Sequence, residues 1–415
     1  MADQQIQTHS ISNGLTLIVE PMADVQSAAF CLLVPAGSNY DPPGQAGAAA
    51  VLCDWIMRGA GSRDSRALSN ELDILGVQRN EGIGNSHISF TGATLAESLP
   101  AALRLYADIV QSPHLPADQF EAARAGVEQN LHAIEDEPRQ KVMVELRRRC
   151  YESPWGIPSE GTLEGVASLD PGAVRRHFET CAGPRDAILG IAGKVDIAAS
   201  IALVEELFGG WQPKAAPSFA TGPRGPARDH ISHESTQTQI GIAYDSVPYR
   251  DPEYYAAWAA VSILSGGMSS RLFTEVREKR GLCYSVYASL NSLRDQGKIL
   301  CYAGTTVERA QETLDVTLQE LVRLGQGISD DELDRCKARA KSSLIMQQES
   351  SSSRASSNAR DWYHLGRVTT LDEVRDKIES LTVEKLLDHI VRHPARDFTV
   401  LTLGPQPLEV NLAVS

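Results

Sequence analysis

The chain has 415 residues, more than one ordinary hydrophobic core can organise, so two or more domains are expected. Its composition, 42% hydrophobic and 22% charged, is that of a soluble globular protein and excludes a disordered chain. A membrane protein is also excluded, because no run approaches the roughly 20 apolar residues that span a bilayer. The net charge of −14 excludes nucleic acid as the main partner.

The N-terminus and the cysteines indicate a compartment. The first nine residues have neither a basic patch nor an apolar run, so no signal peptide is expected. The seven cysteines are an odd, unclustered set, which suits free thiols better than a disulfide framework. We therefore expect a cytoplasmic protein that does not bind membranes.

The first half of the chain predicts strands followed by helices. Leu15, Leu17 and Val19 alternate as in a strand, and residues 28–34 form an apolar run typical of a buried strand. Apolar residues recur at helical spacing near 96–110, and a long polar helix is predicted near 117–148. This order favours a sheet with helices packed on one face.

A Pro- and Gly-rich segment divides the chain. Residues 209–228 hold four prolines and four glycines, a composition typical of a linker. We predict an N-terminal domain at 1–210, a linker at 211–228 and a C-terminal domain at 229–415.

The second half repeats the first. The Arg-Asp, apolar strand and Gly of residues 185–193 return at 396–404, displaced by 211 residues. The strand and helix start at 90–97 return at 301–308 with the same displacement. We therefore predict an α+β protein of two homologous domains, each a mainly antiparallel sheet with helices on one face.

A serine-rich run at 349–357 follows a polar helix predicted near 329–350. Such a run suits a segment for modification or recognition, or a solvated loop between helices. The loop is the favoured interpretation.

Two segments of the first half resemble the zinc-binding helices of peptidase family M16, the insulinase and mitochondrial processing peptidase family. Residues 47–60 read Gly-Ala-Ala-Ala-Val-Leu-Cys-Asp-Trp-Ile-Met-Arg-Gly-Ala, where the family has His-Phe-Leu-Glu-His; the second segment ends in Glu-Asp-Glu-Pro138. The resemblance places Ala50 and Asp54 at the two His positions, Cys53 at the Glu that acts as base, and Asn130 at the third ligand. It implies that the zinc ligands and the base are replaced together.

Other metal sites find little support in the sequence. Cys53 and Asp54 could hold a soft metal, but adjacent helix positions point about 100° apart and the Asn130 amide is a poor third donor. His230 and His233 precede a strand, where positions three apart face opposite sides. The other histidines are dispersed, so we predict no metal in this chain.

The second half carries a more positive signal. Residues 265–287 contain Gly-Gly-Met-Ser-Ser-Arg-Leu-Phe and then Arg-Glu-Lys-Arg-Gly-Leu-Cys-Tyr, which resembles the C-terminal-domain pattern of the same family. The resemblance implies that Arg271 and Tyr284 bind the peptide backbone beside a zinc ion in a facing domain. A guanidinium and a phenol are donors that can stabilise an oxyanion, and Gly266 and Gly267 permit close backbone approach. The competing interpretation is structural, with Arg271 in a capped helix and Tyr284 half-buried.

The resemblance covers essentially the whole chain and is strongest to the short, two-domain M16B type with a LuxS/MPP-like metallohydrolase fold. In that type two chains close like a clam shell, and some members pair a zinc-bearing chain with a zinc-less one. The resemblance implies a non-catalytic subunit of a heterodimeric peptidase, with zinc in the partner subunit and a peptide or unfolded polypeptide as an added strand. The alternatives are a scaffold or peptide-binding homologue without a peptidase role, as a homodimer or in a larger complex, and a peptidase with a displaced metal.

Overall fold

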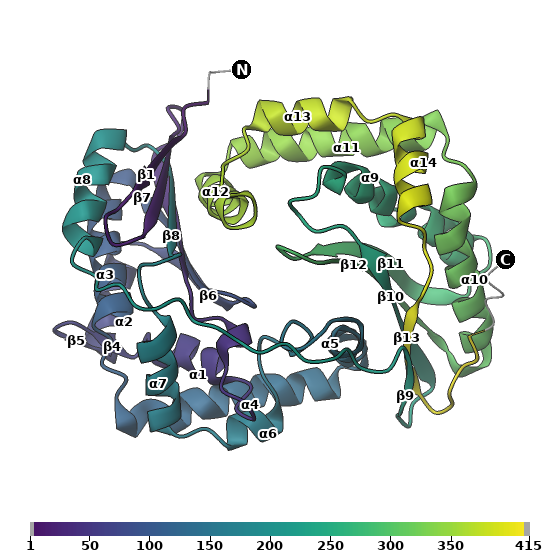
Figure 1. Cartoon of the computed structure of the whole chain (residues 1–415), viewed down its shortest axis with the longest axis horizontal. Coiled ribbons are helices and arrows are strands. Elements are labelled where there is room, and N and C mark those ends of the chain that lie inside the picture. The colour runs from purple at the N-terminus through teal and green to yellow at the C-terminus, as the bar shows by residue number, and fades with distance from the viewer. Residues whose placement is uncertain (1–3, 411–415) are drawn as a thin grey trace. The chain divides into compact units, whose positions relative to one another are not determined.

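A computed structural model describes residues 4–410 (Figure 1). The chain forms two compact units, each made of three separate segments. The first unit comprises Met1–Ala133, Ile157–Thr221 and Ile345–Leu371, and the second comprises Ile134–Gly156, Gly222–Leu344 and Asp372–Ser415. No helix within residues 4–410 is both long and apolar enough to cross a membrane.

The first unit is built on a six-stranded sheet in the order β1-β2-β8-β3-β7-β6. All neighbouring strands are antiparallel except β2 and β8, which are parallel. The strands are β1 (Gln7–Ser10), β2 (Thr16–Pro21), β3 (Ser27–Val34), β6 (Gln78–Ile83), β7 (Ile88–Leu95) and β8 (Ile188–Gly193). Strand β6 is therefore an edge of this sheet.

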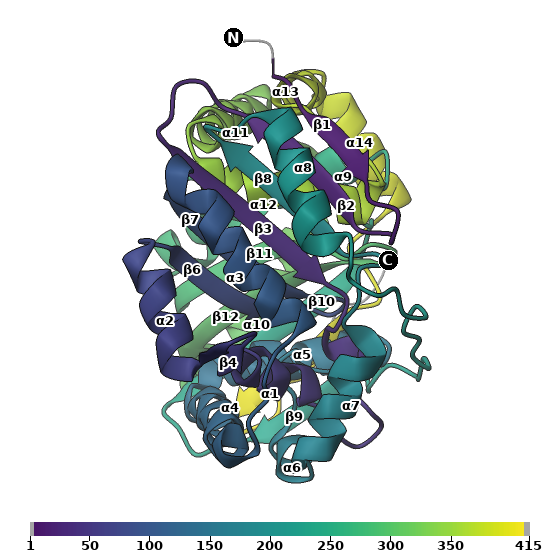
Figure 2. The same ribbon diagram turned by 90° about the vertical axis from the view of Figure 1, so that its left-hand side faces the viewer.

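Successive strand residues point to opposite sides of a sheet, so apolar residues on both sides need cover. Helices cover both faces of the first sheet. On β3, Phe30 packs edge-on against Tyr106 of α3 (Leu99–Gln111). The next residue, Cys31, shares a core on the other face with Ala355 of α12 (Ser351–Leu365). Figure 2 shows α3 and α8 (Ile197–Phe208) lying across the strands on the first of these faces.

Further helices and two short strands complete the first unit. They are η1 (Ser38–Tyr40), α1 (Ala48–Trp55), α2 (Ser65–Ile74), α4 (Phe120–Asp136, which ends in the second unit), α6 (Leu163–Ala167), α7 (Pro171–Cys181) and the two-residue strands β4 (Gly59–Ala60) and β5 (Arg63–Asp64).

The second unit repeats this plan with the strand order β11-β12-β10-β13-β9. Its strands are β9 (Arg228–Ser232), β10 (Gln237–Ser246), β11 (Cys283–Ser292), β12 (Gly297–Thr306) and β13 (Thr399–Gly404). Strand β13 pairs antiparallel with β10 and parallel with β9, as β8 does with β3 and β2. The internal duplication predicted from residues 185–193 and 396–404 is therefore visible in the sheet topology.

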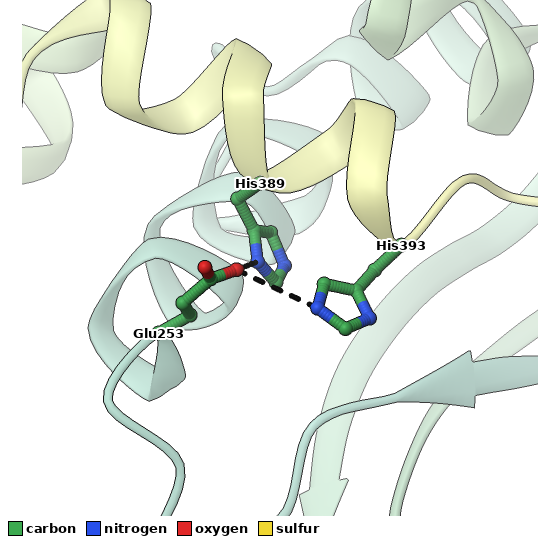
Figure 3. Close-up of side chains that lie close together, drawn as sticks. All are labelled: Glu253, His389 and His393. Carbon is green, nitrogen blue, oxygen red and sulfur yellow. Dashed lines mark hydrogen bonds and ion pairs between the residues drawn. The ribbon is translucent and has the colours of Figure 1, made fainter.

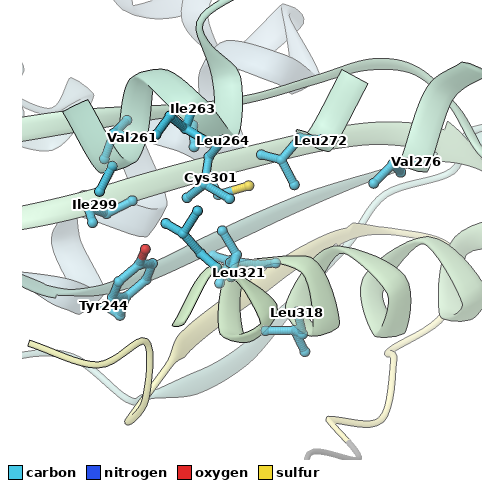
Figure 4. Close-up of a cluster of buried hydrophobic side chains, with 14 of the residues drawn as sticks. Tyr244, Val261, Ile263, Leu264, Leu272, Val276, Ile299, Cys301, Leu318 and Leu321 are labelled. Atoms are coloured by element: carbon cyan, nitrogen blue, oxygen red, sulfur yellow. The ribbon is translucent and has the colours of Figure 1, made fainter. Parts of the chain in front are cut away.

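Helices of the second unit enclose its largest core, part of which Figure 4 draws around Cys301 and Leu321. The helices are α9 (Tyr254–Ser265), η4 (Phe273–Glu278), α10 (Ala310–Arg323), α11 (Asp330–Gln348), α13 (Leu371–Glu379) and α14 (Val383–Arg392).

One helix of each half of the sequence belongs to the other half's sheet. Helix α5 (Pro138–Cys150) packs on β10 and β13 of the second unit, and α12 packs on β3 and β8 of the first. The compact units therefore differ from the linear domains 1–210 and 229–415. The physical reason is that each sheet has two apolar faces, and only the exchanged helix covers the second one.

The serine-rich run was predicted as a loop, and that prediction is wrong. It opens α12, with Ser350 as N-cap accepting a bond from the Ser353 amide. The backbone of α12 comes very close to β8, since the Ala355 carbonyl lies 2.4 Å from where a Cβ of Gly190 would stand. Small side chains on α12 suit this close approach. Composition indicated a solvated loop, whereas the small residues allow close packing on β8.

The duplicated Arg-Asp pairs have a backbone cause. Asp186 and Asp397 both have positive φ, at 62° and 51°. Asp is one of the few residues other than Gly that tolerate this left-handed conformation. The predicted helix at 117–148 is also divided, into α4 and α5, because Pro138 cannot continue a helix from the preceding turn.

Candidate functional site

The helix at the degenerate motif, α1, is fixed firmly at its N-terminus. Asp41 accepts hydrogen bonds from the Gly47 amide at 2.7 Å and the Ala49 amide at 2.8 Å. Gly47 has φ of 115°, and an added Cβ would meet the Val166 side chain at 2.4 Å. The scaffold that would present ligands is thus intact, and only the side chains decide what it can hold.

The side chains on α1 do not form a zinc site. Ala50 is 3% exposed and offers only a methyl group. Burial raises the pKa of the Cys53 thiol to about 12, so the thiol stays protonated at neutral pH. Asp54 forms an ion pair with Arg58, one turn along the helix, at 2.6 Å. A cation beside the only carboxylate of the set opposes binding of a second cation.

The third ligand position lies on α4. An added Cβ on Gly126 would stand 3.9 Å from Asp54 Oδ2, which brings α4 against the end of α1. Asn130, one turn further along α4, is exposed. Within residues 4–410, the only three His, Cys, Asp or Glu side chains close enough to share a metal lie elsewhere, in the second unit. The residues of the degenerate motif therefore do not fit zinc.

Gly266 and Gly267, predicted to approach a peptide, follow α9. A Cβ on Gly266 would lie 2.2 Å from the Ser262 carbonyl, so this position needs glycine for packing within the chain itself. Gly267 has φ of 152°, which favours glycine for the backbone turn. The structure thus explains both glycines without a ligand.

Arg271 is occupied by its own unit. Its Nε donates to Glu332 Oε1 at 2.6 Å, and one terminal nitrogen donates to Glu332 Oε2 at 2.9 Å and to the Gly327 carbonyl at 2.6 Å. The Arg271 hydrogen bond holds the pKa of the Glu332 carboxyl down to about 2, so the pair stays charged. This bidentate pair ties the start of the η4 segment to the start of α11, which agrees with the structural interpretation of Arg271.

Tyr284 is presented quite differently. The side chain is 84% exposed and lies on β11, the edge strand of the second sheet. The pairing of β11 with β12 slips between Cys283 and Ser285, so Tyr284 is the extra residue of a β-bulge. Bulges bend a strand and turn a side chain away from the regular alternation, and they are frequent next to active sites. The competing interpretation of Tyr284 as a half-buried strand residue does not agree with this exposure.

The arginine that accompanies Tyr284 is Arg277 and not Arg271. The Arg277 guanidinium carbon lies 5.5 Å from the Tyr284 ring centre and 4.9 Å from the Phe273 ring centre. Arg277 is exposed, and among the described residues its charge meets these two rings and no carboxylate. It lies on the π-helix η4, a rare conformation that is enriched at functional sites.

Sequence reasoning missed Arg277, although it belongs to the Arg-Glu-Lys-Arg-Gly-Leu-Cys-Tyr segment that was singled out. The available signal was its closeness to Tyr284 in that segment. The contact between Arg277 and Tyr284 could not be predicted from a regular α-helix followed by a regular strand. The π-helix and the bulge both change the direction in which these two side chains point.

Comparison with known proteins identifies the class. Residues 17–162 match the model for insulinase (peptidase family M16), and residues 168–340 match the model for the peptidase M16 inactive domain. The chain belongs to peptidase family M16. The second match begins at residue 168, within the first of the two predicted halves, so the matched regions do not coincide with the halves of the duplication. The fold is the α+β fold expected from the sequence.

Curated relatives of nearly the same length are named as zinc proteases. An uncharacterized zinc protease of Bacillus subtilis, YmxG, is 27% identical over 408 residues, covering 96% of this chain and 98% of the relative. An uncharacterized zinc protease of Mycobacterium tuberculosis, Rv2782c, is 29% identical over 407 residues, covering 95% and 92%. This chain has Ala50 and Asp54 at the positions where the resemblance to the family places the two zinc-binding His residues.

Solved structures confirm the fold. A peptidase M16 inactive domain from Pseudomonas fluorescens has a TM-score of 0.89 at 21% identity, covering 98% of this chain and 100% of that chain. A protease from Helicobacter pylori has a TM-score of 0.89 at 19% identity, covering 97% and 100%. Complex III2 from Candida albicans includes a chain with a TM-score of 0.81 at 19% identity, covering 97% and 96%.

Proposed function

We propose that this chain is the non-catalytic subunit of a two-chain M16 zinc peptidase, which brings Tyr284 and Arg277 to the zinc ion of a partner subunit. One contrast carries the proposal. The side chains of the degenerate motif on α1 are buried or paired within the chain, while Tyr284 is 84% exposed beside an arginine that has no carboxylate partner among the described residues.

The chemistry of the pair suits an anionic transition state. The Tyr284 hydroxyl can donate one hydrogen bond to a peptide carbonyl oxygen, which gains negative charge during attack. The Arg277 guanidinium stays charged and lies against the ring, where it limits the motion of Tyr284 and adds positive charge. The π-helix and the bulge hold both groups in place before a substrate arrives.

Arg271 has a positioning role in this proposal. It fixes the first turn of the η4 segment to Glu332, and η4 in turn carries Arg277. The sequence assigned the peptide contact to Arg271 itself, whereas its guanidinium is already bound bidentately by a carboxylate.

A peptide is the substrate class that the sheets favour. Each sheet has two edge strands, among them β6 in the first unit and β11 in the second, and one side of each pairs with no other described strand. An extended peptide can add to such an edge through main-chain hydrogen bonds, with little dependence on its side chains. The proposed substrate is therefore a peptide or an unfolded polypeptide.

The test is a reconstitution. The purified chain is mixed with a zinc-bearing M16 protein, ideally one encoded beside it, and peptide hydrolysis is measured against either chain alone. Tyr284→Phe removes one hydroxyl and is expected to lower kcat about 100-fold, as expected for loss of one oxyanion donor. Tyr287→Phe, on the same strand but stacked against Tyr302, is the matched control and should leave kcat unchanged.

Two outcomes would reject the proposal. One is the absence of any complex in size-exclusion chromatography, and the other is a Tyr284→Phe complex as active as the wild type. A stable homodimer that neither recruits a zinc-bearing partner nor cleaves peptides would favour the scaffold interpretation instead.

A further inference from the structure

A group of metal-binding side chains lies in the second unit, away from the degenerate motif. Helix α14 ends beside the start of α9, and the two helices pack together. His389 and His393 are four residues apart at the C-terminal end of α14, and Glu253 immediately precedes α9. Figure 3 shows both imidazole rings turned towards the Glu253 carboxylate. No local sequence motif predicts this group, because 136 positions separate Glu253 from His389.

The three side chains converge on one oxygen atom. His389 Nδ1 lies 2.8 Å from Glu253 Oε2, and His393 Nε2 lies 3.5 Å from the same atom. A zinc ion with bonds of about 2.0–2.1 Å in a tetrahedral arrangement holds its ligand atoms about 3.3 Å apart. These two separations lie on either side of this value, and the ligand atoms of all three side chains lie within 4.8 Å of one another.

A simple hydrogen bond accounts for only part of this arrangement. The 2.8 Å contact satisfies His389, but at 3.5 Å the second imidazole is beyond a good hydrogen bond. His389 is only 3% exposed, while the His393 side chain is 38% exposed. A buried ligand, a half-buried one and a carboxylate, with solvent at one side, form a metal site with a free fourth position.

We propose that Glu253, His389 and His393 bind one divalent transition metal ion, of which Zn²⁺ fits best. Two imidazoles and one carboxylate form a common protein ligand set for zinc and the neighbouring divalent ions. The bound ion would join the end of α14 to the start of α9 and so act as a clamp within the second unit.

Arg392 completes the surroundings of the site. It pairs with Glu253 Oε1, the oxygen that does not face the two histidines. That contact orients the carboxylate and leaves Oε2 for the metal, as groups around metal ligands commonly do. The positive charge of Arg392 opposes a bound cation, as that of Arg58 does at Asp54, and so limits the affinity; the difference is that here two imidazoles accompany the carboxylate.

Metal binding is measured on the full-length protein after treatment with a chelator. Equilibrium dialysis against Zn²⁺ should give one ion per chain. His393→Ala should weaken binding at least 100-fold, and because His393 is half exposed this variant keeps its fold, which its metal-free melting temperature checks. Cys53→Ala is the matched control and should bind as the wild type does, which separates this site from the degenerate motif.

Cobalt gives an independent measurement. Co²⁺ held by two histidines and a carboxylate should show tetrahedral ligand-field bands without a thiolate-to-cobalt charge-transfer band. Lack of stoichiometric metal in the wild type would overturn the proposal. So would undiminished binding by His393→Ala, or a charge-transfer band that disappears in Cys53→Ala. None of these outcomes depends on the proposed peptidase partner.

Discussion

The helix α1 and the η4–β11 segment are both regions where this family is expected to do chemistry, and here they differ in how their polar groups are used. On α1, Cys53 is buried and Asp54 is paired with Arg58. On η4 and β11, Arg277 and Tyr284 are exposed and lie against each other, with Phe273 also beside Arg277. The difference teaches that polar groups of one segment can be taken up by internal contacts while those of another stay exposed. A polar side chain that is not used in contacts within the chain remains able to bind another molecule.

The largest expected effect is on the rate at which the Cys53 thiol is alkylated, which tests whether α1 is closed to reagents. Because only the thiolate reacts with alkylating reagents, a pKa of about 12 should slow alkylation of Cys53 about 1,000-fold relative to an ordinary thiol. Peptide-resolved mass spectrometry after iodoacetamide treatment measures this rate in native protein and in urea. A native rate equal to the unfolded rate would show that α1 presents an open, reactive site.

Arg271 and Arg277 should differ clearly in stability. Arg271→Ala leaves the Glu332 carboxylate without its bidentate partner and should lower the free energy of unfolding by about 3 kcal/mol. Arg277→Ala loses only ring contacts and should cost about 0.5–1 kcal/mol. Urea unfolding of both variants measures the difference, and equal losses would contradict the assignment of separate roles.

Acid should remove the contribution of the Arg271–Glu332 pair. The folded pKa of Glu332, about 2, is below the unfolded value, so its stabilisation is complete above pH of about 4.3 and disappears as pH falls towards 2. Since solvent partly screens the pair, about 1–2 kcal/mol should be lost. Urea midpoints of wild type and Glu332→Gln across this range measure it, and the gap between the two proteins should narrow as pH falls. A constant gap would be inconsistent with the pair.

The smallest effect is expected at Asp54. Its ion pair with Arg58 is exposed, so Asp54→Asn should change the free energy of unfolding by less than about 0.5 kcal/mol. The reconstituted peptidase activity should also stay within about twofold, because the residue has no part in the proposed chemistry. A large loss of activity in this variant would return α1 to the functional site.

Much of the architecture could be predicted from local pattern. Strand alternation at Leu15, Leu17 and Val19 and the repeated Arg-Asp strands correspond to observed elements. These signals are local, since they depend on side-chain period and on turn chemistry. The exchange of α5 and α12 between the halves could not be predicted in this way, because an apolar helix face does not specify which of two similar sheets it covers.

The sequence by itself determined the family, the duplication and the replacement of the family's zinc ligands and base by Ala50, Cys53, Asp54 and Asn130, since these depend only on which residues stand in which order. Only the tertiary structure decided which polar groups are already in use. It assigned Arg271 to Glu332, placed Arg277 against Tyr284, and brought Glu253 to His389 and His393. The physical reason is that pairing and exposure depend on contacts between residues far apart in the chain, and on local irregularities such as a π-helix and a bulge.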